Sequence, residues 1–255
     1  MIRRLGSEVS GEVRALAGEP TTLLLGATTV LLISHYQGST GAFHEHFSAR
    51  YGDHPALSAL SHFWWFGTSM LFYVAIPLLL SVATRGRFND RYGFGLGNWR
   101  EGVTLSLVFG AVMVPVVWWA STLESFAGLY PLAGSGAYTL NLGGGKTQLS
   151  LPLFVGYEAA YFAYFIGWEF LFRGWLTLGL EPHFGRTGAL MVPIAPFALM
   201  HFGKAEPEAL GSIIAGLALG LLALRTRSFW YGAVLHGGIA VFMDVVSAWK
   251  HLAKA

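Results

Sequence analysis

The stretch GVTLSLVFGAVMVPVVWWA, residues 102–120, carries no charged side chain and is rich in branched and aromatic residues. A helix needs about 20 mostly apolar residues to cross the hydrocarbon core of a bilayer, because each residue adds only about 1.5 Å of rise. This stretch is therefore a predicted membrane-spanning helix, and it determines how the rest of the chain is interpreted.

Other apolar segments on both sides of this stretch have a similar character: residues 20–36, 62–83, 149–167, 189–201, 210–224 and 229–249. The segment at 149–167 is expected to continue through 168–180, whereas 189–201 and 210–224 are short for a span and suggest tilting or burial in protein. We therefore predict an all-α, polytopic transmembrane bundle of about seven spans, between six and eight, that forms one domain over residues 1–255.

The composition supports a membrane protein and excludes several other classes. Hydrophobic residues make up 54% of the chain and charged residues 12%, against about 25% charged residues in an ordinary soluble domain. The net charge of +2, without a stripe of Lys and Arg, argues against a nucleic-acid partner. The absence of cysteine excludes disulfides, thiolate metal sites and a cysteine nucleophile.

Basic residues are unevenly distributed between the predicted loops, and cytoplasmic loops are enriched in them. The first and third loops hold one each, Arg50 and Lys146, whereas the N-terminal segment holds three and the second loop four: Arg3, Arg4, Arg14, Arg85, Arg87, Arg91 and Arg100. We therefore expect an integral protein of the bacterial cytoplasmic membrane with a cytoplasmic N-terminus and no cleaved signal peptide. Lys250 and Lys254 near the C-terminus do not fit an odd number of spans.

Ionisable side chains inside spans are costly, so each is a candidate for function. They are Glu158, Glu169, Arg173, His201, His236 and Asp244. Glu169 and Arg173 are spaced i and i+4, so they can pair on one helix face. This pair is either a structural ion bridge or a carboxylate base held by its partner.

The remaining candidates also have two interpretations. Glu158 is nearly on the face of Glu169 but about 16 Å along the helix, and it either faces the same cavity or bonds to Tyr157 or Tyr161. A lone histidine such as His201 or His236 is usually a core residue. One glutamate and two histidines on three spans can instead form a single polar centre in an apolar bundle.

Three stretches resemble the motifs of a known family: WEFLFRG at 168–174, FALMH at 197–201, and His236 with the small residues after it. They are similar to those of the CAAX prenyl protease and bacteriocin-processing family, also called type II CAAX endopeptidases or the abortive-infection family. The resemblance covers roughly residues 149–249. It implies a helical intramembrane endopeptidase, and members of this family act on prenylated C-termini or in peptide maturation, immunity and protein sorting.

The resemblance carries over residue by residue. Glu169 and Arg173 match the second Glu and the Arg of the family's Glu-Glu-x-x-x-Arg motif. Phe197 and His201 match its Phe-x-x-x-His motif, and His236 matches the histidine of its last motif.

Two positions depart from the pattern of the family. Trp168 stands where the family has its first Glu, which usually receives the water-activating role. Ala240 stands where an Asn or Asp is expected four residues after His236, and Asp244 lies one turn further on. These departures put the standard mechanism, and activity itself, in question.

We expect peptide hydrolysis inside a membrane cavity. Glu169 is the expected general base and shares the water with His201, while His236 stabilises the oxyanion and Arg173 holds the rotamer of Glu169. Three further residues are expected to support the site or to contact substrate: Glu158, Phe197 and Asp244. The expected partners are the lipid bilayer and a membrane-embedded or lipidated peptide or protein.

Three alternatives remain open. Glu169, His201 and His236 form a possible three-ligand set for zinc, so the cofactor is either none or a divalent metal. A catalytically inactive protein that binds and regulates a membrane partner is favoured by Trp168 and Ala240. A transporter is disfavoured, because the sequence has no internal repeat.

Overall fold

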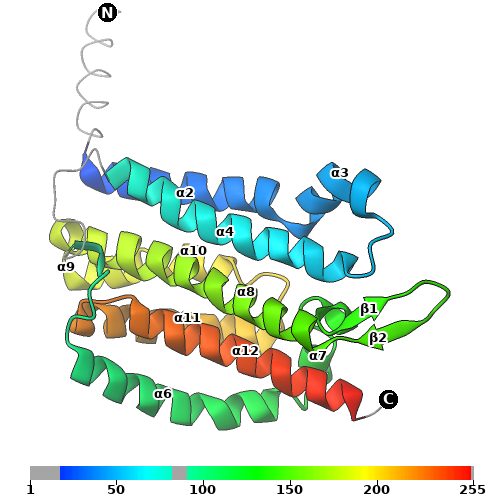
Figure 1. Ribbon diagram of the computed structural model, residues 1–255. Coiled ribbons are helices and arrows are strands. Elements are labelled where there is room, and N and C mark those ends of the chain that lie inside the picture. Colours follow the sequence, from blue (N-terminus) through cyan, green and yellow to red (C-terminus); the bar gives the residue numbers. More distant parts are fainter. Residues whose placement is uncertain (1–17, 82–90, 254–255) are drawn as a thin grey trace, which may run out of the picture.

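Four helices in the described part of the chain are long and apolar enough to cross a membrane. They are α4 (Leu57–Ser81), α6 (Trp99–Ala120), α11 (Glu206–Thr226) and α12 (Trp230–Leu252). The computed structural model describes residues 18–81 and 91–253, in which these helices lie side by side in a bundle (Figure 1). The protein is therefore a nearly all-helical integral membrane protein, and the predicted number of about seven spans is not confirmed by length and composition alone.

Two more helices follow predicted segments closely. α2 (Glu19–Gly38) covers the predicted segment 20–36, and α8 (Leu151–Glu169) covers all but the first two residues of 149–167. α8 continues without a break as a π-helix, Phe170–Leu178, and then as α9 (Gly179–Met191). The predicted continuation of this segment through residue 180 is confirmed.

The predicted segment 189–201 does not form one continuous helix. The chain forms the end of α9, a turn, and the short helix α10 (Ile194–Leu199). Pro193 and Pro196 explain the break, because proline lacks the amide hydrogen of the helix ladder and its ring clashes with the preceding turn. The turn that follows α10 carries His201.

The first and third loops have structure of their own. The first loop forms α3 (Thr40–Tyr51), whose N-terminus is capped by Ser39. The third forms α7 (Glu124–Ala127), a 3₁₀-helix at Gly134–Ala137, and an antiparallel hairpin of β1 (Thr139–Asn141) and β2 (Thr147–Leu149). The third loop, residues 121–148, is therefore not a plain surface loop, since Tyr130 and Ala137 in it are buried.

Three ion pairs lie together at one end of the bundle. At one end lie α9, the start of α2 and the turn between α11 and α12, and at the other lie the hairpin and the C-terminal end of α12 (Figure 1). The first end holds ion pairs between Glu19 and Arg91, Glu101 and Arg225, and Glu181 and Arg227. Six other basic residues lie outside the described residues: Arg3, Arg4, Arg14, Arg85, Arg87 and Lys254.

Aromatic packing and one glycine bring α4 against α8. Phe66 of α4 stacks on Tyr161 of α8 with ring centroids 4.8 Å apart. At Gly167 the two backbones approach so closely that a Cβ would lie 2.9 Å from the Cα of Met70. This contact fixes the depth of α8 in the bundle, and therefore the position of Glu169 two residues further on.

Gly167→Ala is expected to destabilise the folded protein by about 1–3 kcal/mol, because the added methyl group overpacks a contact with backbone rather than with a movable side chain. Thermal unfolding of the detergent-solubilised protein measures the effect. Gly156→Ala is the matched control on the same helix, since a Cβ there meets only Phe63 at 3.8 Å. Equal stability of the two variants would contradict the packing account.

Candidate active site

Glu169 is completely buried and bound on both of its carboxylate oxygens. Arg173 donates from Nε to Oε2 over 3.1 Å, and His236 donates from Nδ1 to Oε1 over 2.7 Å. Glu169 and Arg173 come from the segment that begins at α8, whereas His236 comes from α12. The predicted pairing of Glu169 with Arg173 is confirmed, and one carboxylate connects two elements of the bundle.

Glu169 is the last residue of α8 before the backbone changes to the π-helix. Within that segment the hydroxyl of Thr177 donates to the carbonyl of Phe172 over 2.8 Å, and all nine residues are buried. π-Helical turns are rare and are frequent at functional sites. Here the turn carries Arg173, whose guanidinium carbon lies 4.4 Å from the ring centroid of Phe197.

Gly232 makes room for the carboxylate on the α12 side. A Cβ at this position would lie 2.8 Å from Oε2 of Glu169. Gly232 was not predicted as a site residue. It lies one helical turn before His236 and therefore on the same face of α12. Glycine is needed at this position because the carboxylate of Glu169 occupies the space that a side chain would fill.

His201 lies in the turn after α10, beside His236. Its Nδ1 is 2.8 Å from the carbonyl oxygen of Phe197, which can only accept, so Nδ1 carries the hydrogen. In the neutral ring Nε2 then has a free lone pair. The rings of His201 and His236 are nearly parallel, at 7°, with centroids 6.4 Å apart. The expected proximity of Glu169, His201 and His236 is confirmed, while their chemical roles stay predictions.

Trp168 packs edge-on against both histidines, with ring centroids 5.9 Å from His201 and 6.3 Å from His236. Its side chain is buried, and its Nε1 has no hydrogen-bond partner within the described ranges. The residue that departs from the family pattern therefore touches the centre of the cluster. A carboxylate at the same position would face the two histidine rings.

Glu158 and Asp244 are not part of this cluster. Both are buried; neither oxygen of Glu158 has a hydrogen-bond partner in the part of the chain that the structure describes, and the Asp244 carboxylate faces the backbone of Leu132 in the third loop. The expectation that Glu158 bonds to Tyr157 or Tyr161 is wrong. The hydroxyl of Tyr157 instead accepts a hydrogen bond from the amide of Ala133 in the third loop.

A second polar group, which the sequence analysis missed, ties the third loop to the turn of His201. Tyr130 donates to both carboxylate oxygens of Glu208 over 2.7 Å and accepts from Lys204 over 2.9 Å. Burial lowers the pKa of the Lys204 ammonium and raises the pKa of the Tyr130 hydroxyl. Lys204 is three residues after His201, so its bond to Tyr130 restrains the turn that carries His201.

The residues of the cluster do not fit the three-ligand metal site considered from the sequence. Both oxygens of Glu169 are bound to Arg173 and His236, which leaves the two histidines without the third ligand. Over residues 18–81 and 91–253, no group of three or more His, Cys, Asp or Glu side chains is arranged to hold a metal ion. This includes His44, Glu45 and His46 on α3.

Comparison with known proteins identifies the segment that carries this cluster. Residues 150–242 match the family model described as Type II CAAX prenyl endopeptidase, Rce1-like. No curated protein and no solved structure matches the chain. The match includes α8, the π-helix, α10, and the part of α12 with Gly232 and His236. The resemblance of the three motifs is thus confirmed, since residues 150–242, which contain all three, match the model of the Rce1-like type II CAAX prenyl endopeptidase family.

Proposed function

We propose that the protein is an intramembrane endopeptidase that hydrolyses a peptide bond in a membrane-embedded or lipidated peptide or protein. The observation that carries this proposal is the contact of Glu169 with His236 beside His201, within the segment that matches an endopeptidase family. These side chains come from three separate parts of the chain. A buried constellation of a carboxylate and two imidazoles is suited to moving a proton where bulk water is scarce.

We also propose a single domain with seven passes through a bacterial cytoplasmic membrane. The seven passes are the four long apolar helices, α2, α8 with its π-helical extension, and one pass that is broken between α9 and α10. A cytoplasmic N-terminus is supported by Arg91, Arg225 and Arg227 at the end of the bundle where α2 begins.

His201 is the proposed general base. The water oxygen forms a bond to the substrate carbonyl carbon while its proton passes to Nε2 of His201, the ring nitrogen with the free lone pair. When the carbon–nitrogen bond breaks, His201 returns the proton to the departing amine. This role was expected of Glu169, but both oxygens of that carboxylate already accept hydrogen bonds inside the protein.

His236 is the proposed oxyanion donor. When both of its ring nitrogens carry protons, Nδ1 donates to Glu169 and Nε2 is left to stabilise the negative charge that develops on the substrate oxygen. Glu169 balances the charge and orients the ring, as the carboxylate does in a serine protease triad. Arg173 holds Glu169 in place. Phe197 fixes His201 through its carbonyl, and Glu158 and Asp244 are proposed to support substrate further along α8 and α12.

The alternative is a catalytically inactive protein that binds a membrane partner and regulates it. The observation that favours it is the indole of Trp168, which lies against both histidine rings. If the indole occupies the space of the reacting water, the cluster can bind a partner but cannot hydrolyse it.

Glu169→Gln is expected to reduce cleavage per folded molecule by about 10²–10⁴-fold, and also to lower the yield of folded protein, because the buried Arg173 loses its compensating charge. Glutamine has the same size but is neutral and has only one acceptor oxygen, so it cannot accept from both Arg173 and His236. His236 then loses the charged group that orients it. Co-expression with a panel of candidate membrane substrates measures cleavage. Glu206→Gln, an exposed change at the start of α11, is the control. Normal cleavage by Glu169→Gln would remove the carboxylate from the mechanism.

Trp168→Glu separates the active protein from the inactive alternative in the same assay. We expect the unchanged protein to cleave and Trp168→Glu to cleave less, because a second buried carboxylate beside Glu169 is strongly destabilising. The opposite pattern, in which only Trp168→Glu cleaves, would establish the inactive alternative. Size-exclusion profiles measure the amount of folded protein in each case, so that cleavage is compared per folded molecule.

A further inference from the structure

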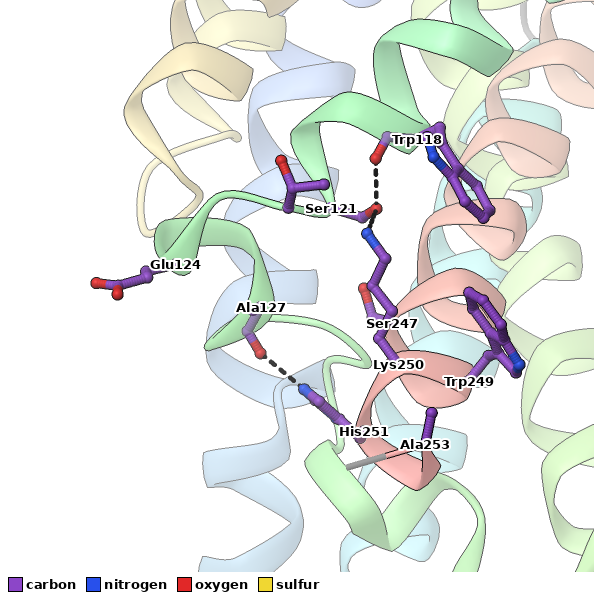
Figure 2. Close-up of a pocket in the computed structure, with 10 residues that line it drawn as sticks. Trp118, Ser121, Glu124, Ala127, Ser247, Trp249, Lys250, His251 and Ala253 are labelled. Carbon is purple, nitrogen blue, oxygen red and sulfur yellow. Dashed lines mark hydrogen bonds between the residues drawn. The ribbon is translucent and has the colours of Figure 1, made fainter. Parts of the chain in front are cut away.

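A pocket of about 580 Å³ lies at the end of the bundle that carries the C-terminus. It is formed by the C-terminal ends of α6 and α12 and by the turn that contains α7 (Figure 2). Lys250 in this pocket is 14 residues beyond His236 on α12, which corresponds to about 21 Å along the helix. The pocket is therefore separate from the candidate active site.

Lys250 places a positive charge between the two helices. Its Nζ donates to the hydroxyl of Ser121 over 2.6 Å and lies 5.3 Å from the ring centroid of Trp118. The hydroxyl of Ser121 in turn donates its hydrogen to the carbonyl of Trp118, and its oxygen accepts the hydrogen bond from Lys250. An ammonium group has three N–H donors, and only one of them is used by this hydrogen bond.

The other polar groups of the pocket leave this charge unopposed. Ser247 is buried on the wall, and within the described residues its hydroxyl has no hydrogen-bond partner. His251 donates to the carbonyl of Ala127, and the carboxylate of Glu124 points away from Lys250 (Figure 2). A buried hydroxyl without a partner is unusual in a folded protein. Together, the ammonium and the hydroxyl provide two donors for an anion.

Two exposed tryptophans mark the level of the pocket in the membrane. The rings of Trp118 and Trp249 are 5.9 Å apart, and about half of each side chain is exposed. Tryptophan is enriched where the hydrocarbon core meets the headgroups of a bilayer. Basic side chains near helix ends also extend to this level. The pocket thus has the composition of a headgroup site.

The surfaces that lead away from the pocket are apolar. On α12, Val245 and Trp249 are exposed one helical turn apart, and Leu252 continues the same stripe. On α6, Leu107 and Val114 are exposed on the same helix face as Trp118 and lead towards it. In a membrane protein such faces are covered by acyl chains. A ligand with a polar head in the pocket and two chains along these faces is a lipid.

We propose that this pocket binds the phosphate headgroup of an anionic glycerophospholipid. The phosphate accepts hydrogen bonds from Lys250 and Ser247, the tryptophans flank the glycerol region, and the acyl chains lie along the exposed faces of α6 and α12. Basic pockets between transmembrane helices bind acidic lipid headgroups in this manner. The bound lipid would join the two helix ends independently of the catalytic cluster.

Native mass spectrometry of the full chain in detergent tests the proposal, with phosphatidylglycerol or phosphatidylcholine added at equal concentration. We expect the unchanged protein to retain phosphatidylglycerol about fivefold more than phosphatidylcholine. Lys250→Gln should abolish this preference. Lys146→Gln, which removes the same charge from the exposed hairpin loop, should leave it unchanged.

Three results would overturn the proposal. They are the absence of a preference in the unchanged protein, an equal loss of preference in Lys250→Gln and Lys146→Gln, and displacement of the lipid by millimolar inorganic phosphate. Because Lys250→Gln also removes the bond to Ser121, Trp249→Ala provides a second variant that leaves this bond intact. Trp249→Ala should weaken retention of phosphatidylglycerol, and undiminished retention would contradict the site.

Discussion

The structure around the candidate active site depends on the Glu169 carboxylate and its two hydrogen bonds. A fully buried charge is tolerated only when partners compensate for the loss of water, and removal of one partner is strongly destabilising. Arg173 supplies the compensating charge from the same segment, and His236 supplies a second donor from α12. The π-helix after Glu169 and the missing side chain at Gly232 are the local adjustments that make room for this arrangement. The proposed chemistry follows from it, since Glu169 orients His236 beside His201.

Much of the fold and part of the site could be predicted from local features of the sequence. Helical segments such as 102–120 are apolar over the length of a bilayer, which is a property of one continuous stretch. The pairing of Glu169 with Arg173 follows from helical periodicity alone. The order of the three motifs was sufficient to identify the family, and the family model matches the segment that contains them.

The rest depends on contacts between segments far apart in the chain, which one sequence does not specify. The apolar composition of 189–201 suggested a span, but the backbone restrictions of Pro193 and Pro196 prevailed. Nothing local to Tyr130 indicates that it reaches Glu208, or that Trp168 packs against two histidines. One interpretation of Glu158 was a bond to a neighbouring tyrosine, yet the hydroxyl of Tyr157 meets a loop amide instead.

The hydrogen bond from Nδ1 of His236 to Glu169 can be observed without any substrate. Nitrogen-15 labelling of the nine histidines allows NMR detection of ring N–H protons that are shielded from solvent exchange. The account predicts one strongly deshielded, slowly exchanging ring N–H resonance that disappears in Glu169→Gln and in His236→Asn and persists in His201→Asn. Persistence of this resonance in Glu169→Gln would show that the carboxylate does not hold His236, and would contradict the central claim.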